Sequence, residues 1–214
     1  MFDIVLLKIM LTKIRRQDRL DRYPSFPLRS YNSDNNEGEF YYPPIFSSYV
    51  LTLPSKSFKG HSKALGIELT KLAKALHTNT LIFLGDTETP WLVQHNNYKP
   101  ANEAQEYLTK QKIGRRFNGA LQVDISELPI FTKHIAWLIR CNATLPDFHF
   151  TDEGQTIIGS ICQYGNLHLD MLDGPSDGIL MAFVDSSKFQ YGNENSCHNW
   201  FSKTSAILGR RTVL

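Results

Sequence analysis

The sequence is short of cysteine, of net charge and of long apolar runs. Its 214 residues include three cysteines, an odd number that argues against a disulfide framework and fits a reducing compartment. No C-x-x-C pair is present, which argues against a thiolate zinc site. The apolar segment within 1–14 is too short to span a bilayer and has no small-residue cleavage site. We therefore predict a cytoplasmic protein without a membrane span.

The balanced charge and the absence of common motifs argue against further functional classes. The 23 basic and 21 acidic residues give a net charge of +2, which supplies no overall field for steering nucleic acid or an anionic membrane. The glycine patterns of P-loop and dinucleotide-binding proteins are absent, as are the Gly-x-Ser-x-Gly and His-Glu-x-x-His motifs. These absences exclude the commonest nucleotide-binding and hydrolase classes, and we expect no cofactor.

What is present is the patterning of an ordinary globular chain, with 42% hydrophobic and 12% aromatic residues. Apolar residues recur at helical spacing in 62–76 and 130–139, and a polar helix is expected at 101–112. Strands are expected at 45–53, 80–84, 91–93, 120–125, 147–151, 155–163, 167–172 and 179–184.

This order of segments predicts an α+β fold. A mixed or mainly antiparallel sheet is expected to carry helices packed on one face and to end in a C-terminal antiparallel meander, all within a single domain at 45–214. Residues 1–44 are predicted to form a short helix at 4–14 and, from 23 to 44, an irregular aromatic-rich connection.

The segment 162–170, CQYGNLHLD, holds a thiol, an imidazole and a carboxylate within nine residues. His168 and Asp170 share one face of a predicted strand, because strand side chains alternate. With a two-residue turn taken from 164–166, in either register, Cys162 lies opposite a leucine on the other face. A Cys162–His168 catalytic dyad is therefore excluded, and Cys162 is interpreted as a small core residue.

A metal site is the alternative that this segment leaves open. His168 and Asp170, with a third ligand such as His198 or His149, would match the composition of the facial triad of non-haem iron sites. An ordinary polar sheet face explains the pair equally well, since the chain has seven histidines. A reactive Cys197 beside His198 is a further hypothesis, for which the sequence shows no orienting partner.

Aromatic residues crowd the N-terminal connection. The candidates for a partner-binding patch are Tyr31, Phe40, Tyr41 and Tyr42, because tyrosine-rich surfaces are typical of interfaces. The alternative is that these side chains pin the connection across the sheet of their own domain.

The densest positive run, 13–22, indicates a basic patch formed by Arg15, Arg16, Arg19 and Arg22. A second basic group would extend it if the two regions lie side by side, and comprises Lys110, Lys112, Arg115 and Arg116. Aspartates interrupt the first run, and the second lies at a predicted helix end, where cations favour the helix dipole. Solvated structural charge is therefore the preferred interpretation.

Three functions follow, in order of preference. The first is a non-catalytic protein-interaction module, immunity-like or adaptor-like, whose partner is another protein. It is supported by the missing catalytic motifs, the balanced charge and the aromatic-rich segment. The order of elements also resembles, at the level of fold, that of small bacterial immunity proteins and other interaction proteins. The alternative is an unrecognised enzyme or metal-binding protein that uses His168 and Asp170. The third is nucleic-acid binding through the N-terminal basic run.

Overall fold

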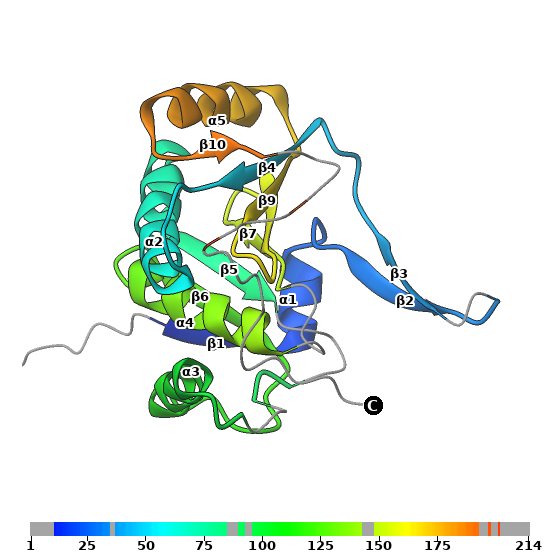
Figure 1. The fold of residues 1–214 in the computed structure, drawn as a ribbon. Helices are drawn as coiled ribbons and strands as arrows, with labels where there is room; N and C mark the ends of the chain where they lie inside the picture. Colours follow the sequence, from blue (N-terminus) through cyan, green and yellow to red (C-terminus); the bar gives the residue numbers. More distant parts are fainter. Residues whose placement is uncertain are drawn as a thin grey trace, which may run out of the picture.

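Eight strands form one antiparallel sheet in the computed structural model (Figure 1). The structure describes residues 11–34, 37–84, 90–92, 96–142, 148–192, 197 and 201. In sheet order the strands are β1 (Leu11–Ile14), β6 (Ala120–Asp124), β5 (Thr80–Leu84), β7 (Phe150–Asp152), β8 (Ile157–Ile161), β9 (Leu167–Met171), β4 (Ser47–Thr52) and β10 (Gln190–Tyr191). The strands β7, β8 and β9 are consecutive in both chain and sheet, which confirms the predicted meander.

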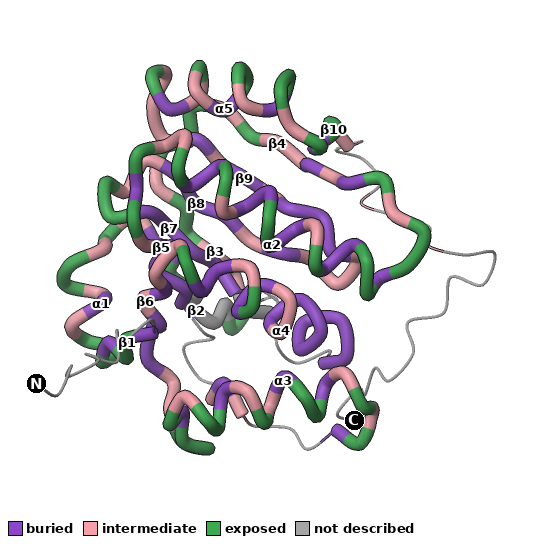
Figure 2. Tube along the Cα trace, turned by 90° about the vertical axis from the view of Figure 1, so that its left-hand side faces the viewer, coloured by how far each residue is buried: buried purple, intermediate pink, exposed green. Residues whose placement is uncertain are grey.

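Helices cover one face of this sheet. These are α2 (Phe58–Ala75), α4 (Leu128–Cys141) and α5 (Gly174–Ser186), and α3 (Lys99–Lys110) packs against α4 (Figure 2). Because α4 lies between α2, α3 and the sheet, most of its residues are buried (Figure 2). The helices and the antiparallel sheet together confirm the predicted α+β fold class.

Close contact between α2 and α4 depends on a glycine. A Cβ on Gly66 would lie 2.7 Å from the carbonyl oxygen of Pro129, so the two helix backbones can approach this closely only where no side chain intervenes. The helix α2 itself begins at Ser57, whose Oγ accepts a hydrogen bond from the backbone N–H of Gly60 at 3.2 Å.

Strand alternation separates the two faces of the sheet. In β9, Leu167, Leu169 and Met171 are buried against the helices, whereas His168 and Asp170 are half-buried and point to the opposite side. The shared face of His168 and Asp170 confirms the sequence prediction. We call the two sides the helix-covered face and the second face.

Among the described helices, only one lies on the second face, at one end of the sheet. There the short helix α1 (Arg16–Arg22) and the segment after it contribute Phe26, which packs with Ile82 and Leu84 of β5. Arg19 of α1 is buried, with its guanidinium 4.3 Å from the centre of the Phe26 ring. No described helix covers the second face over β4, β8 and β9.

The N-terminal region differs from its prediction in two ways. Residues 11–14 were expected in a helix but form β1, because pairing with β6 buries Leu11 and Ile14; residues 1–10 lie outside the described part of the chain. The connection at 23–44 is not irregular throughout. It contains a hairpin of β2 (Leu28–Asn32) and β3 (Glu37–Tyr41), which extends away from the main body in Figure 1.

Two predicted strands were wrong. Residues 179–184 belong to α5, because Asp173 caps that helix by accepting a hydrogen bond from the N–H of Ser176 at 2.7 Å and Pro175 occupies its first turn. The preceding Asp-Gly-Pro sequence therefore starts a helix and does not turn a hairpin. In the predicted strand 91–93, residues 91 and 92 form a turn and residue 93 lies outside the described chain.

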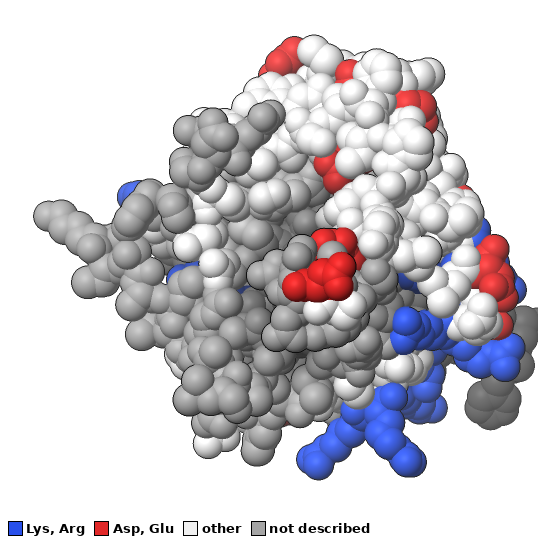
Figure 3. All heavy atoms as spheres, turned by 90° about the vertical axis from the view of Figure 1, so that its right-hand side faces the viewer, with Lys and Arg blue, Asp and Glu red and all other residues white. Residues whose placement is uncertain are grey.

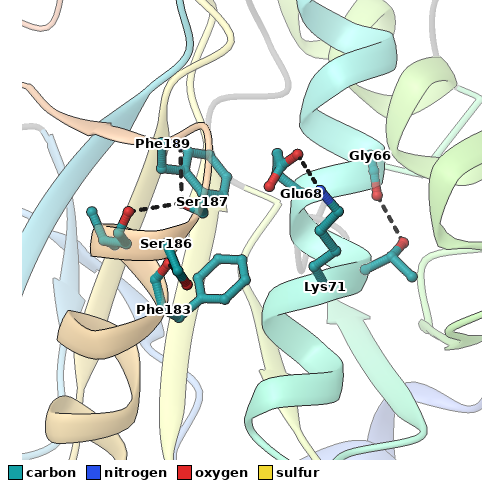
Figure 4. Close-up of polar contacts among 9 residues, drawn as sticks. Gly66, Glu68, Lys71, Phe183, Ser186, Ser187 and Phe189 are labelled. Carbon is teal, nitrogen blue, oxygen red and sulfur yellow. Dashed lines mark hydrogen bonds and ion pairs between the residues drawn. The ribbon is translucent and has the colours of Figure 1, made fainter.

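The helices α2 and α5 face each other across a partly polar interface (Figure 4). Glu68 of α2 is buried there, and its carboxylate pairs with the ammonium of Lys71 on the same helix at 2.8 Å. The neighbouring end of α5 is closed by Ser187, whose Oγ donates to the carbonyl of Val184 and accepts from the N–H of Phe189. No helix in the described ranges is long and apolar enough to cross a membrane.

Candidate metal centre

A three-residue loop between β8 and β9 places Cys162 on the second face. Ser160 pairs with His168, and two residues further along the strands the N–H of Cys162 donates to the carbonyl of Asn166 at 3.0 Å. Gly165 closes the loop, with φ at +83° and its N–H donating to the carbonyl of Cys162 at 2.8 Å. The predicted two-residue turn was wrong. An odd loop shifts the register by one residue and so reverses the face on which Cys162 lies.

The predicted exclusion of a Cys162–His168 pair fails with that register. Cys162 is half-buried and does not belong to the core, and its Sγ lies 3.2 Å from the Sγ of Cys197. The Nε2 of His168 lies 3.1 Å from the same Cys197 sulfur, and Asn166 donates to it through Nδ2 at 3.1 Å. We call Cys162, His168 and Cys197 the metal cluster, since their ligand atoms all lie within 4.8 Å of one another.

Hydrogen bonding divides the two thiols of the metal cluster into a donor and an acceptor. The pKa of Cys197 is lowered by the hydrogen bond from the Cys162 thiol and further by those from His168 and Asn166, although burial opposes the shift. The pKa of Cys162 is raised by its hydrogen bond to Cys197 and by burial. Without a metal, the negative charge therefore resides on Cys197.

The donor set of the metal cluster suits a zinc ion. Two thiolates and an imidazole are preferred ligands of Zn²⁺, and three protein ligands leave one tetrahedral position open. Zinc–sulfur bonds of about 2.3 Å would hold two sulfurs about 3.8 Å apart in that geometry. The observed sulfur separation of 3.2 Å has to widen by only about half an ångström to admit the ion.

A cavity of about 340 Å³ lies next to the metal cluster on the second face, and His168 belongs to both. We call it the sheet cavity. Its walls are Tyr42, Ser48, Tyr49, Val50, His149, Ile158, Gly159, Ser160, His168 and Asp170. Its volume falls within the range of small-molecule sites.

Two hydrogen bonds fix polar groups in the sheet cavity. Ser48 donates to Asp170 Oδ1 at 2.7 Å, across the β4–β9 pair. On the opposite side, the hydroxyl of Tyr42 lies 3.2 Å from His149 Nε2. Burial and, to a smaller extent, the positive charge of Arg19 lower the pKa of His149 to about 4, so this ring is neutral at pH 7.

The structure separates the residues that the sequence grouped as metal ligands. His168 belongs to the metal cluster, whereas Asp170 and His149 line the sheet cavity and are not among the converging ligand atoms. His198 lies outside the described residues. Sequence reasoning missed Cys162 and Cys197 as ligands, because a glycine such as Gly165 suits a two-residue turn as well as a three-residue loop.

Some of the aromatic candidates pack against their own domain and others are exposed to solvent. The rings of Phe40 and Tyr42 pack against His149, with centroid distances of 5.3 and 5.9 Å. Tyr41 points to solvent with 57% of its surface exposed, and the side chain of Tyr31 lies outside the described part. Protein binding through these residues stays a prediction.

The two basic segments lie side by side, because Lys13 Nζ donates to the carbonyl of Lys112 at 3.1 Å. Figure 3 shows lysine and arginine side chains gathered along one lower edge of the molecule. Arg15 is paired with Asp18 at 2.8 Å and Arg19 is buried, so neither is free to hold an anion at the surface. The other two arginines of the predicted patch are Arg16 and Arg22.

Comparison with known proteins adds no information on function. No family model, no curated protein and no solved structure matches this chain.

Proposed function

We propose that this protein binds a zinc ion through Cys162, His168 and Cys197. The observation that carries the proposal is the convergence of two sulfurs and an imidazole nitrogen within 4.8 Å of one another. Cys162 and His168 belong to the β8–β9 hairpin, whereas Cys197 lies 35 residues after Cys162. The three side chains are only partly buried and lie on the second face, so core packing does not account for their meeting.

The ligand number favours a catalytic zinc site over a structural one. Structural zinc sites are closed by four protein ligands, whereas catalytic sites keep a position for water or substrate. A zinc ion in such a position lowers the pKa of a bound water to about 7 and polarises a carbonyl or phosphoryl group. The cavity beside His168 offers room for a substrate, so metal-assisted hydrolysis is the reaction class that the site supports best.

The proposal is tested by measuring zinc affinity in tag-free protein by competition with a chromophoric chelator. The wild type should bind one zinc per chain. Replacing a group outside the ligand shell of a zinc site typically costs 10- to 100-fold in affinity, so Cys162→Ser, His168→Ala and Cys197→Ser should each lose more than about 100-fold.

The matched control is His77→Asn, which removes an exposed histidine at a positive φ of 55° that asparagine tolerates. This variant should bind zinc like the wild type. Equal affinity in the wild type and in all three cluster variants would contradict the proposal.

The same variants distinguish zinc from a metal-free nucleophile. His168 Nε2 lies 3.1 Å from Cys197 Sγ, which is also the geometry of a thiolate–imidazole pair. Such a pair has no need of Cys162 as a ligand. If Cys162→Ser abolishes zinc binding together with activity, the metal is required; if activity survives the loss of zinc, the nucleophile is the better explanation.

Protein binding is a second candidate, and one observation favours it. The hairpin β2–β3 and the segment after it expose Leu28, Tyr41, Ile45 and Phe46, an unusual number of large apolar side chains for one region. A double variant, Tyr41→Ser with Phe46→Ser, should lose a protein that co-purifies with the wild type in quantitative affinity purification. Identical co-purifying proteins for both forms would contradict this function.

A further inference from the structure

The sheet cavity carries a single unbalanced charge. Among the described residues, no lysine or arginine lines it, and its ionisable groups besides the tyrosines are His149, His168 and Asp170. The lowered pKa of His149 keeps that ring neutral, and the positive charge of His168 lowers the pKa of Cys197 and is offset by the thiolate of that residue. Two thiolates would balance the two charges of a bound zinc ion, so the carboxylate of Asp170 sets the sign of the cavity with or without metal.

Asp170 is oriented but not neutralised. Ser48 donates to its Oδ1 and thereby fixes the carboxylate within the cavity. In the described ranges of the chain, Asp170 makes no ion pair. A half-buried carboxylate without a counter-ion is stabilised by a cationic ligand, and it disfavours an anionic one.

Aromatic rings form the wall on the other side of the sheet cavity. Tyr42 packs edge-on against His149, with ring centroids 5.9 Å apart, and Phe40 packs against both of these rings. These rings offer an apolar surface to the uncharged part of a ligand. A carboxylate at one end of the cavity and an aromatic wall at the other suit a ligand that carries an ammonium or amidinium group on an apolar body.

We propose that the sheet cavity binds a small organic cation, a primary amine or an amidine, whose positive group pairs with Asp170. This inference goes beyond zinc binding and does not depend on it. Asp170 and His168 are two residues apart on one strand face, about 7 Å along β9. The uncharged end of such a ligand therefore reaches the metal cluster, which gives the hydrolysis proposed above a substrate class.

Arg19 is a buried cation that acts on the other end of the cavity. Its charge is felt by His149, which lies two strands and one row of side chains away from Asp170, a separation of roughly 12 Å by sheet geometry. Arg19 itself is not part of the cavity lining. The cationic group is therefore expected at the Asp170 end and the neutral part of the ligand toward His149 and His168.

The test compares three probes of nearly identical shape: benzylamine, benzyl alcohol and benzoate. Each is titrated into isotope-labelled protein, and chemical shifts of the backbone amides are followed. Benzylamine should shift the resonances of Ser48, Ser160 and Asp170 and bind at least about tenfold more tightly than benzyl alcohol, the factor expected of one charge-assisted contact. Benzoate should leave these resonances unchanged.

Two variants assign the effect to the carboxylate. Asp170→Asn should reduce the affinity for benzylamine to that for benzyl alcohol, and Ser48→Ala should reduce it by a smaller factor. The control is Asp177→Asn, which removes a carboxylate that accepts hydrogen bonds from Ser47 and Tyr49 but is not part of the cavity lining. This control should bind benzylamine like the wild type.

Three outcomes overturn the proposal: benzoate binding as tightly as benzylamine, no shifts with benzylamine up to its solubility limit, or unchanged affinity in Asp170→Asn. Zinc content is measured on every sample. Asp170 is not a proposed zinc ligand, so loss of cation binding with zinc retained refutes only this inference, and loss of zinc in the wild type refutes only the metal site.

Discussion

The two faces of the β8–β9–β4 part of the sheet are built from the same strands and differ in kind. On the helix-covered face, Leu167, Leu169 and Met171 are buried under helices. On the second face, the intervening His168 and Asp170 are half-buried beside a cavity of about 340 Å³. Because side chains alternate along a strand, one set of residues packs in the core and the intervening set lines the candidate site.

Adjacent residues of β4 show the same division. Ser47 hydrogen-bonds to Asp177 of α5 and so joins the sheet to its helical layer. Ser48, one position later, hydrogen-bonds to Asp170 within the sheet cavity. Two serine–aspartate pairs of similar chemistry therefore serve packing in one case and a ligand site in the other, and only the face distinguishes them.

The largest effect is expected from truncating neighbours on opposite faces. Leu169→Ala removes a fully buried side chain and should lower the free energy of unfolding by about 2–5 kcal/mol. His168→Ala, one residue away, should cost less than about 1 kcal/mol in metal-free protein, because its side chain is only half-buried. Urea unfolding of both variants measures the difference. Equal losses would show that the second face is also part of the core.

Acid should act mainly through buried histidines, and His149 is the one in the sheet cavity. Its pKa of about 4 in the folded protein lies below its ordinary value of 6.5, so between these values the unfolded chain binds more protons than the folded one. The free energy of unfolding should therefore fall as the pH drops from about 6.5 to about 4, by on the order of 3 kcal/mol from this residue.

His149→Gln isolates that contribution, because His134 also has a pKa lowered to about 4 by burial and remains in the variant. Chemical unfolding at several pH values should show a shallower pH dependence in His149→Gln than in the wild type. Parallel curves would mean that His149 is not held neutral by the fold.

A smaller effect is expected in the loop that sets the register. Gly165→Ala places a side chain at a φ of +83° and brings its Cβ to 2.7 Å from the ring of His61. The substitution should destabilise the protein by about 1–3 kcal/mol and weaken zinc binding, because the loop holds Cys162 on the second face. Gly178→Ala, at an exposed position inside α5 with no described atom within 4 Å of its Cβ position, is the control. It should leave zinc affinity unchanged and stabilise the protein by up to about 1 kcal/mol, because alanine favours a helix over glycine. Unchanged zinc affinity in Gly165→Ala would separate the loop from the site.

The smallest expected effect is a difference in the rate at which the cysteines are alkylated in metal-free protein at pH 7. Cys197 should be alkylated by iodoacetamide first, because its pKa is lowered by hydrogen bonds from Cys162, His168 and Asn166. Cys141 should react far more slowly than Cys197, since its side chain is fully buried and burial raises its pKa to about 11. Mass spectrometry of the peptides gives the order, and zinc should protect Cys197. Faster reaction of Cys141 would contradict the assigned environments.

Local sequence patterns were sufficient to predict which face of the sheet a residue within a strand points to, but not which residues form the candidate site. The alternation of LHLDM in β9 is enough by itself to place His168 and Asp170 on one face. The position of Cys162 depended on whether the following loop has two residues or three, a difference that composition does not settle. Cys197 approaches from a distant segment, and such long-range contacts leave no trace in local spacing. The cap at Asp173 was visible but was interpreted as a turn.

X-ray absorption at the zinc edge of the protein loaded with one equivalent of zinc tests the metal centre most directly. We expect two sulfur ligands at about 2.3 Å and nitrogen or oxygen ligands at about 2.0–2.1 Å, with one sulfur lost in either Cys162→Ser or Cys197→Ser. A spectrum with only nitrogen and oxygen neighbours, or one that both serine variants leave unchanged, would contradict the assignment of Cys162, His168 and Cys197 as the zinc ligands.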